Sequence, residues 1–229
     1  DAIVGVKALL CIMAKKYLSV EKNEDCFCIL EKLNSALCSK ANMKPALSFQ
    51  ILAGKEINAD DRRTLENGGA RGFSTFMAYY ILKALARSGS NNMVNIIKEF
   101  YGGMLLKGAT AFWEDFDIDW LENSCGIDEF PKEGEADIHG DFGKHCYKQF
   151  RHSLCHGWSA GVVAFVVEYI LGIRIENGGD KVFFNPHPMG IKNISAKIPL
   201  KADWITLNIH NGKNEINVPD GTELITVND

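Results

Sequence analysis

The sequence predicts a mainly α-helical protein that ends in a small antiparallel β domain. Through most of the chain, apolar residues recur every three to four positions, the spacing of one buried helix face, and polar or glycine-rich breaks separate the segments. After Gly178-Gly179 the spacing changes to two, which is typical of half-buried strands. Asn211-Gly212 then supplies a strong hairpin signal. We therefore divide the chain into a helical part, residues 1–176, and a β part, residues 177–229.

The composition is that of a soluble globular protein. The chain has 229 residues, 46% of them hydrophobic, which is enough for one large domain or a medium one with an appendage. Lys and Arg total 25, Asp and Glu total 29, the net charge is −4, and the basic residues form no runs. Nucleic acid and membranes are therefore poor partners, and a neutral ligand fits better.

The seven cysteines favour a reducing compartment and argue against a metal centre. Their number is odd, and several lie among apolar residues of helical segments, where a reduced cysteine acts as a small hydrophobic side chain. Zinc ligands could come from cysteines 125, 146 and 155 and histidines 139, 145 and 156, but no C-x-x-C or H-x-x-x-H spacing joins them. We expect seven free thiols, no zinc, no cofactor and a cytoplasmic location.

The sequence shows no signal peptide and no uninterrupted apolar run of membrane length. It begins at Asp1, directly before a helical segment. We therefore expect the chain to be a piece of a longer protein, whose targeting signals need not be present here.

The first two helices are predicted to form a hairpin across a polar break at residues 21–25. The predicted buried faces are Ile3, Val6, Leu10, Met13, Ala14 and Tyr17 in the first helix and Cys26, Leu30, Leu33 and Leu37 in the second. A third helix spans about residues 45–52, with Pro45 in its first turn. A fourth follows the Asn58-Ala59-Asp60 cap signal.

The clearest helical pattern follows the glycine-rich break at residues 67–72. It consists of Phe73, Phe76, Met77, Tyr80, Ile81, Ala84 and Leu85. Another helix, marked by Val94, Ile97, Tyr101, Met104 and Leu105, ends near Gly108. The segment from Val162 to Leu171 is apolar on nearly every side and predicts a buried helix. Helix pairs that alternate with long loops, without a fixed repeat length, favour an α/α toroid over a solenoid.

The β part is predicted to contain strands at residues 181–185, 205–209, 216–218 and 224–227. Asn211-Gly212 and Asp220-Gly221 supply turns between the later strands. A unit of roughly fifty residues is small for independent folding, so we expect it to pack against the helical part.

Carboxylates and aromatic residues are concentrated between Gly108 and Asp119, where the helical pattern stops. Glu114 directly follows Trp113, and the segment also contains Phe112, Asp115, Phe116, Asp117 and Asp119. An aromatic ring can pack against the apolar face of a sugar, and a nearby carboxylate can activate a water for attack on an anomeric carbon. The same segment also fits an acidic loop whose aromatic residues pack in the core.

The polar loop over residues 122–151 and the segment after it add further candidates. The loop contains Asp137, His139, Asp141 and His145, and loops of this length are commonly functional or disordered. His156 and Trp158 lie among glycines at the start of the last helix, where their side chains are accessible to a ligand. A structural role for His156 is equally compatible with the sequence.

Several motifs, taken in order, resemble the C-terminal portion of bacterial α-L-rhamnosidases. They are the segments Gly72–Ala86, Gly108–Phe116, Asp137–Gly143, Ser153–Gly161 and Glu168–Ile173. The resemblance extends over essentially the whole chain, although Arg71-Gly72 and Ala160-Gly161-Val162 depart slightly from the family pattern. It implies an (α/α)6 barrel followed by a C-terminal β domain, and inverting hydrolysis of terminal α-L-rhamnose without a metal.

The resemblance also implies roles for individual residues. Glu114 matches the general base, and Trp113, His156 and Trp158 match positions that line the sugar pocket. His139 and Asp141 lie in a motif near that pocket. The general acid belongs to an earlier barrel segment, which this chain lacks. Six or seven predicted helices, against the twelve of a closed barrel, make residues 1–176 a C-terminal portion that we expect to be inactive alone.

Two other functions stay open. One is a glycosidase of the same toroid fold with a different sugar specificity, because a fold does not fix a substrate. The other is a non-catalytic carbohydrate-binding or scaffold module, in which aromatic residues stack on sugar but Glu114 has no partner acid. Neither the linkage and aglycone of the substrate nor the oligomeric state can be predicted from this sequence.

Overall fold

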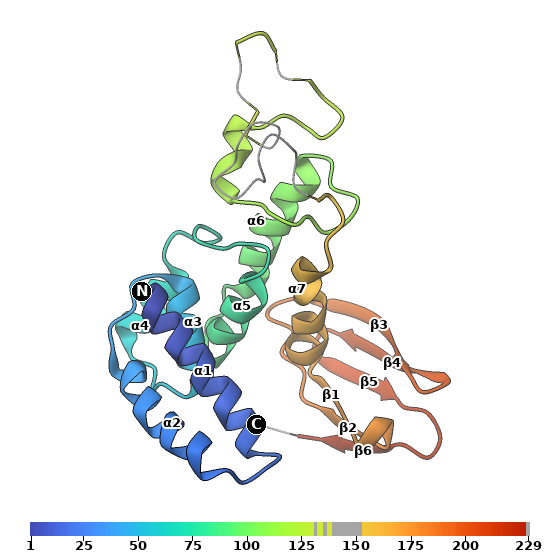
Figure 1. Cartoon of the computed structure of the whole chain (residues 1–229). Coiled ribbons are helices and arrows are strands. Elements are labelled where there is room, and N and C mark those ends of the chain that lie inside the picture. The colour runs from blue at the N-terminus through green and yellow to red at the C-terminus, as the bar shows by residue number, and fades with distance from the viewer. Residues whose placement is uncertain (131, 135–136, 139–152, 228–229) are drawn as a thin grey trace. The chain divides into compact units, whose positions relative to one another are not determined.

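The structure is a computed structural model that describes residues 1–130, 132–134, 137–138 and 153–227 (Figure 1). It contains two compact units, Asp1–Val162 and Val163–Asp229. The first is helical, and the second carries the strands. Within the described ranges, no helix is long and apolar enough to cross a membrane.

The boundary between the units lies earlier than the predicted division after residue 176. Residues that follow Val163 belong to the core of the strand unit, because Val166, Val167 and Leu171 pack in the same cluster as the strands. The segment Ile173–Glu176, which we had assigned to the helical part, is itself a strand. The end of the last helical segment thus belongs with the β unit.

The helical unit contains the predicted helices in the predicted order. They are α1 (Ala2–Leu18), α2 (Glu24–Asn34), α3 (Lys44–Ala53), α4 (Ala59–Glu66), α5 (Ala78–Arg87) and α6 (Met93–Leu106). α4 begins with a capping box, in which the Asn58 side chain accepts from the Asp61 amide and the Asp61 side chain accepts from the Asn58 amide. α5 begins at Ala78 rather than at Phe73. Phe73 and Ser74 have no regular secondary structure, and residues 75–77 form a turn before it.

α1 packs against α2 and α3 (Figure 1), but of the residues predicted to be buried only Ala14 is buried. Its buried residues are Gly5, Ala8, Cys11 and Ala14. The large residues of the predicted face are exposed instead, at 72% for Ile3, 58% for Val6, 43% for Leu10, 58% for Met13 and 44% for Tyr17. A Cβ atom added to Gly5 would lie 3.3 Å from the Ala46 Cα atom, so small residues allow α1 and α3 to approach closely.

A row of aromatic rings connects the helices to the segment that carries Glu114. The ring centroids of Phe73 and Phe100 are 5.7 Å apart, those of Phe100 and Phe116 are 5.3 Å apart, and those of Phe116 and Trp113 are 6.1 Å apart. Phe116 also packs on the α6 backbone, because a Cβ atom added to Gly103 would lie 2.8 Å from its ring. The buried row of α6 is shifted by one position from the prediction, and the predicted Leu105 is 68% exposed.

The second unit contains two three-stranded sheets (Figure 1). One has the order β1-β2-β6 (Ile173–Glu176, Lys181–Phe184 and Glu223–Thr226), and the other has the order β3-β4-β5 (Asn193–Leu200, Asp203–His210 and Lys213–Asn217). The predicted turn between β4 and β5 is confirmed, with positive φ angles of 49° at Asn211 and 81° at Gly212. The predicted antiparallel arrangement is wrong for one pair, because β2 and β6 are parallel.

The helical segment that spans the boundary at Val163 consists of α7 (Gly161–Phe165) and one π-helical turn (Val166–Ile170). It ends at Gly172, whose φ is +65° and where an added Cβ atom would lie 1.9 Å from the Asn185 carbonyl oxygen. Only glycine fits a backbone contact this close. Side chains from this segment and from both sheets share one core.

A buried lysine supports the glycine-rich turn before α5. Lys44 is 6% exposed, and its Nζ donates to the Gly69 carbonyl oxygen at 2.5 Å and lies 5.3 Å from the centre of the Phe73 ring. The Glu99 carboxylate accepts from the Ala70 amide at 2.9 Å. Burial lowers the pKa of Lys44 from its ordinary 10.5 to about 8, and the nearby Glu99 charge opposes the shift.

We expect the stability of the wild-type protein to rise, relative to Lys44→Met, as the pH increases from about 8 toward 10.5. In that range the unfolded lysine holds more protons than the folded one, so the cost of burying the charge is relieved as pH rises. The full difference is on the order of 3 kcal/mol. Urea unfolding of both proteins across this range measures it, and parallel stability curves would contradict the prediction.

Candidate functional site

Main-chain hydrogen bonds place the Glu114 segment beside residues 153–156. The Glu114 amide donates to the Ser153 carbonyl oxygen at 2.8 Å, and the His156 amide donates to the Phe112 carbonyl oxygen at 2.7 Å. Two segments that are distant in the sequence therefore run side by side. The contact brings His156 and Trp158 into the neighbourhood of Glu114.

The carbonyl oxygen of Glu114 accepts two further hydrogen bonds from side chains. The Trp158 indole Nε1 donates to it at 2.7 Å, and the buried hydroxyl of Thr75 also donates to it. Thr75 lies in the turn before α5, so three separate parts of the helical unit meet at one peptide group. This arrangement fixes the main chain of Glu114 from several directions.

The carboxylate of Glu114 is half-buried, and one of its oxygens is oriented by the backbone. Its Oε2 atom accepts from the Ser153 amide at 2.9 Å. A carboxylate that is held by a neutral donor and keeps solvent exposure can accept a proton from a water molecule.

Exposed aromatic surface lies next to this carboxylate. Trp158 is 44% exposed, and its ring centroid is 4.3 Å from that of His156. The ring of Phe76, also 44% exposed, meets Trp158 edge-on at a centroid distance of 5.8 Å. Together these rings form an aromatic surface of the kind that packs on the apolar face of a sugar.

Trp113 does not contribute to that surface, although the sequence analysis placed it in the sugar pocket. Its side chain is 0% exposed and packs beside Phe116. Over residues 112–115 the side chains are alternately partly exposed and buried, and Trp113 is buried while Glu114 is partly exposed. Trp113 thus supports the Glu114 segment by packing in the core beside Phe116.

The neighbouring aspartates have other partners. Asp115 is buried, and its Oδ1 accepts from the Phe116 amide at 3.0 Å. Asp117 caps the 3-10 helix Ile118–Asn123 by accepting from the Asp119 amide at 3.0 Å. Asp119 accepts from Arg71 at 2.8 Å. These contacts give the three aspartates structural roles and leave Glu114 as the carboxylate beside the aromatic surface.

Two predicted site residues, His139 and Asp141, lie outside the described residues. The described Asp137, from the same motif, is buried and accepts from the Cys125 amide at 3.2 Å. Thr75 and Phe76 were not predicted as site residues, because the apolar spacing from Phe73 to Leu85 indicated a helix. The polar Thr75 within an apolar pattern was the available signal.

No group of three His, Cys, Asp or Glu side chains that could hold a metal occurs among the residues that the structure describes. The described cysteines are all free thiols, namely Cys11, Cys26, Cys28, Cys38, Cys125 and Cys155.

Burial raises the pKa of Tyr101, so its hydroxyl stays protonated, and it donates to the Ser159 carbonyl oxygen at 3.3 Å.

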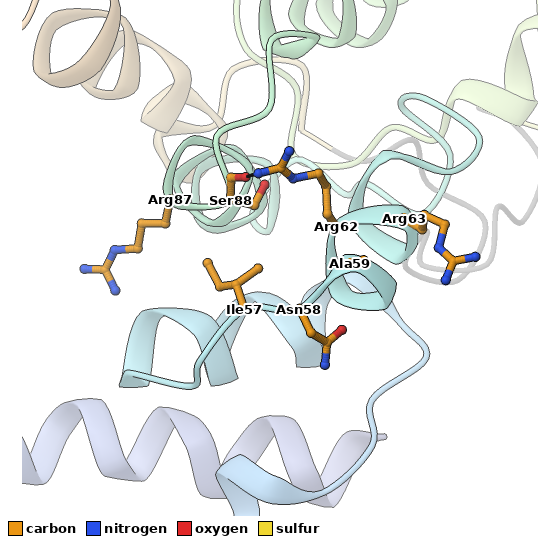
Figure 2. Close-up of a pocket in the computed structure, with 7 residues that line it drawn as sticks. All are labelled: Ile57, Asn58, Ala59, Arg62, Arg63, Arg87 and Ser88. Carbon is orange, nitrogen blue, oxygen red and sulfur yellow. Dashed lines mark hydrogen bonds between the residues drawn. The ribbon is translucent and has the colours of Figure 1, made fainter.

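A separate hollow of about 620 Å³ contains none of the predicted site residues (Figure 2). It is lined by Ile57, Asn58, Ala59, Arg62, Arg63, Arg87 and Ser88. Arg62 donates to the Ser88 carbonyl oxygen just after α5, and Arg87 donates to the Ile51 and Leu52 carbonyl oxygens near the end of α3. Arg63 and Arg87 point away from the hollow (Figure 2), so these arginines do not converge on a ligand.

The chain shares its fold with a solved glycoside hydrolase. The similar structure is described as the crystal structure of a GH78 family rhamnosidase of Bacillus sp. GL1, with a TM-score of 0.63, 19% sequence identity and 89% of this chain covered. The chain spans 23% of that chain. No protein-family model matches the sequence, and no curated protein matches it. The likeness supports a helical domain followed by a small β domain.

We expect Thr75→Val to lower the free energy of unfolding by about 1–2 kcal/mol, because it removes a buried hydroxyl that donates to Glu114. It should also speed hydrogen exchange at the Trp158 indole, which shares the same acceptor. Thr64→Val in α4 is the matched control. Equal effects of the two changes on stability and on indole exchange would show that the Thr75 hydroxyl does not hold the site.

Proposed function

We propose that this chain is part of a glycoside hydrolase that cleaves terminal α-L-rhamnose with inversion, and that Glu114 is its general base. The observation that carries the proposal is an oriented, half-buried carboxylate beside the exposed aromatic surface of Trp158 and His156. The fold shared with a GH78 family rhamnosidase supports the same reaction class. In this proposal, residues 1–176 are the C-terminal portion of an (α/α)6 barrel.

The proposed reaction needs two carboxyl groups on opposite sides of the glycosidic bond. Glu114 takes a proton from a water molecule while the water oxygen forms a bond to the anomeric carbon. The bond from that carbon to the leaving oxygen breaks, and a general acid protonates the leaving group. Asp115, Asp117 and Asp119 each hold a structural contact, which supports a general acid that lies in a preceding barrel segment.

The proposed sugar platform consists of Trp158, His156 and Phe76. The rings of His156 and Phe76 each contact the Trp158 ring, and Trp158 also fixes the Glu114 main chain through its indole nitrogen. One side chain therefore couples the position of the sugar ring to that of the base. His139 and Asp141 are proposed to lie near the same pocket, on the strength of their motif alone.

We expect Glu114→Gln to lower kcat on an aryl α-L-rhamnoside by roughly 10²–10⁴-fold in the longer protein that carries this chain, with little change in sugar binding. Glutamine preserves the shape and the contact with the Ser153 amide but accepts no proton. Asp115→Asn and Asp117→Asn are matched controls that should cost stability instead. The configuration of the first product, read by NMR, should be inverted.

A near-normal kcat for Glu114→Gln, or a product of retained configuration, would show that the residue or the mechanism is wrong. Turnover on other aryl glycosides but not on the rhamnoside would point to another sugar. Sugar binding without turnover in the longer protein would favour a carbohydrate-binding module.

We expect Trp158→Ala to weaken binding of L-rhamnose to this chain by about tenfold, because it removes the stacking surface. Trp158→Phe keeps a ring but loses the hydrogen bond to Glu114, so its effect on affinity should be smaller. Trp113→Phe should lower stability and leave binding unchanged, because Trp113 is buried. Calorimetric titration measures each affinity, and loss of binding in Trp113→Phe alone would reverse our assignment.

A further inference from the structure

α1 carries large apolar side chains on the face opposite to its buried one. We call Ile3, Val6, Leu10, Met13 and Tyr17 the α1 stripe; their exposures range from 43% to 72%. The buried face consists of the small residues Gly5, Ala8, Cys11 and Ala14, which pack in the helical core. A helix that is apolar on opposite sides is normally covered on both. The α1 stripe is uncovered in this structure.

The spacing of the α1 stripe is that of a helix-binding seam. Its members follow one another at intervals of three, four, three and four residues, which is the heptad pattern of two helices in lengthwise contact. α1 has 17 residues, and a helix of that length runs about 25 Å at about 1.5 Å per residue. The seam is therefore long enough for two heptads of a partner helix.

Positive charge borders the α1 stripe on both sides. Lys7 and Lys16 are exposed and lie about 80–100° from the centre of the stripe, in opposite directions, at about 100° of rotation per residue. α1 contains no Asp or Glu. Lys15 is turned to the other side, where its Nζ donates to the Ala53 carbonyl oxygen. At the C-terminal end, Glu21 is the acidic group that reaches the stripe, by accepting from the Tyr17 hydroxyl.

We propose that the α1 stripe binds a partner helix with apolar residues at the same three- and four-residue spacing and with Asp or Glu on its flanks. Acidic flanks would meet Lys7 and Lys16, as the flanking charges of paired helices do. A second copy of α1 fits less well, since its flanks also carry lysine and no carboxylate. This inference does not depend on the role of Glu114.

The test uses two synthetic helical peptides as long as α1, both with leucine at the seam positions. One has glutamate at the flanking positions, and the other has lysine. Fluorescence anisotropy at low salt should show the glutamate peptide binding at least tenfold more tightly than the lysine peptide. Added salt should reduce the difference, because exposed charges are screened.

Substitutions in the chain separate the apolar and the charged contributions. Leu10→Asp should weaken binding of the glutamate peptide by tenfold or more, whereas Leu106→Asp, at an 81% exposed position of α6, should leave it unchanged. The double change Lys7→Glu with Lys16→Glu should reverse the preference between the two peptides. All of these positions are exposed, so thermal unfolding should confirm that each variant keeps its fold.

The proposal is overturned if neither peptide binds, if both bind equally, or if Leu106→Asp weakens binding as much as Leu10→Asp. Sedimentation of the chain without peptide tests whether a second copy of the chain is the occupant. A dimer that Leu10→Asp dissociates would show that a second copy covers the α1 stripe, and would also overturn the proposal.

Discussion

The hydrogen bonds at the main chain of Glu114 join three parts of the helical unit that are distant in the sequence. The Ser153 carbonyl oxygen, the Thr75 hydroxyl and the Trp158 indole all meet the same residue. The position of the carboxylate therefore depends on this framework of hydrogen bonds.

Buried aromatic rings support the segment whose main chain these hydrogen bonds fix. Phe116 packs on α6 at Gly103, and Trp113 packs on Phe116, so the segment that carries Glu114 is attached to a helix by two large buried rings. A carboxylate on such a segment is held without being buried itself. The same packing buries Trp113, whereas the next residue, Glu114, stays partly exposed.

The sequence was most informative where one residue controls local geometry. The Asn58 cap, Pro45 in the first turn of α3, and the Asn211-Gly212 turn each have a specific backbone requirement, and each lies where it was predicted. The grouping of Glu114 with His156 and Trp158 came from the motifs, and the pairing of their segments agrees with it. Periodicity was less reliable for helix faces. The buried row of α6 was off by one position, since neighbouring rows were both apolar.

Long-range packing could not be predicted from local patterns. β6 pairs in parallel with β2 after the whole β3-β4-β5 sheet has intervened, and no local signal specifies that partner. The face that α1 buries has the same origin, because both of its faces are apolar and the small residues of one face, such as Gly5 beside Ala46, allow α3 to approach closely. Selection by small residues leaves the large ones outside, where they keep the spacing and the flanking charges of a helix-binding seam.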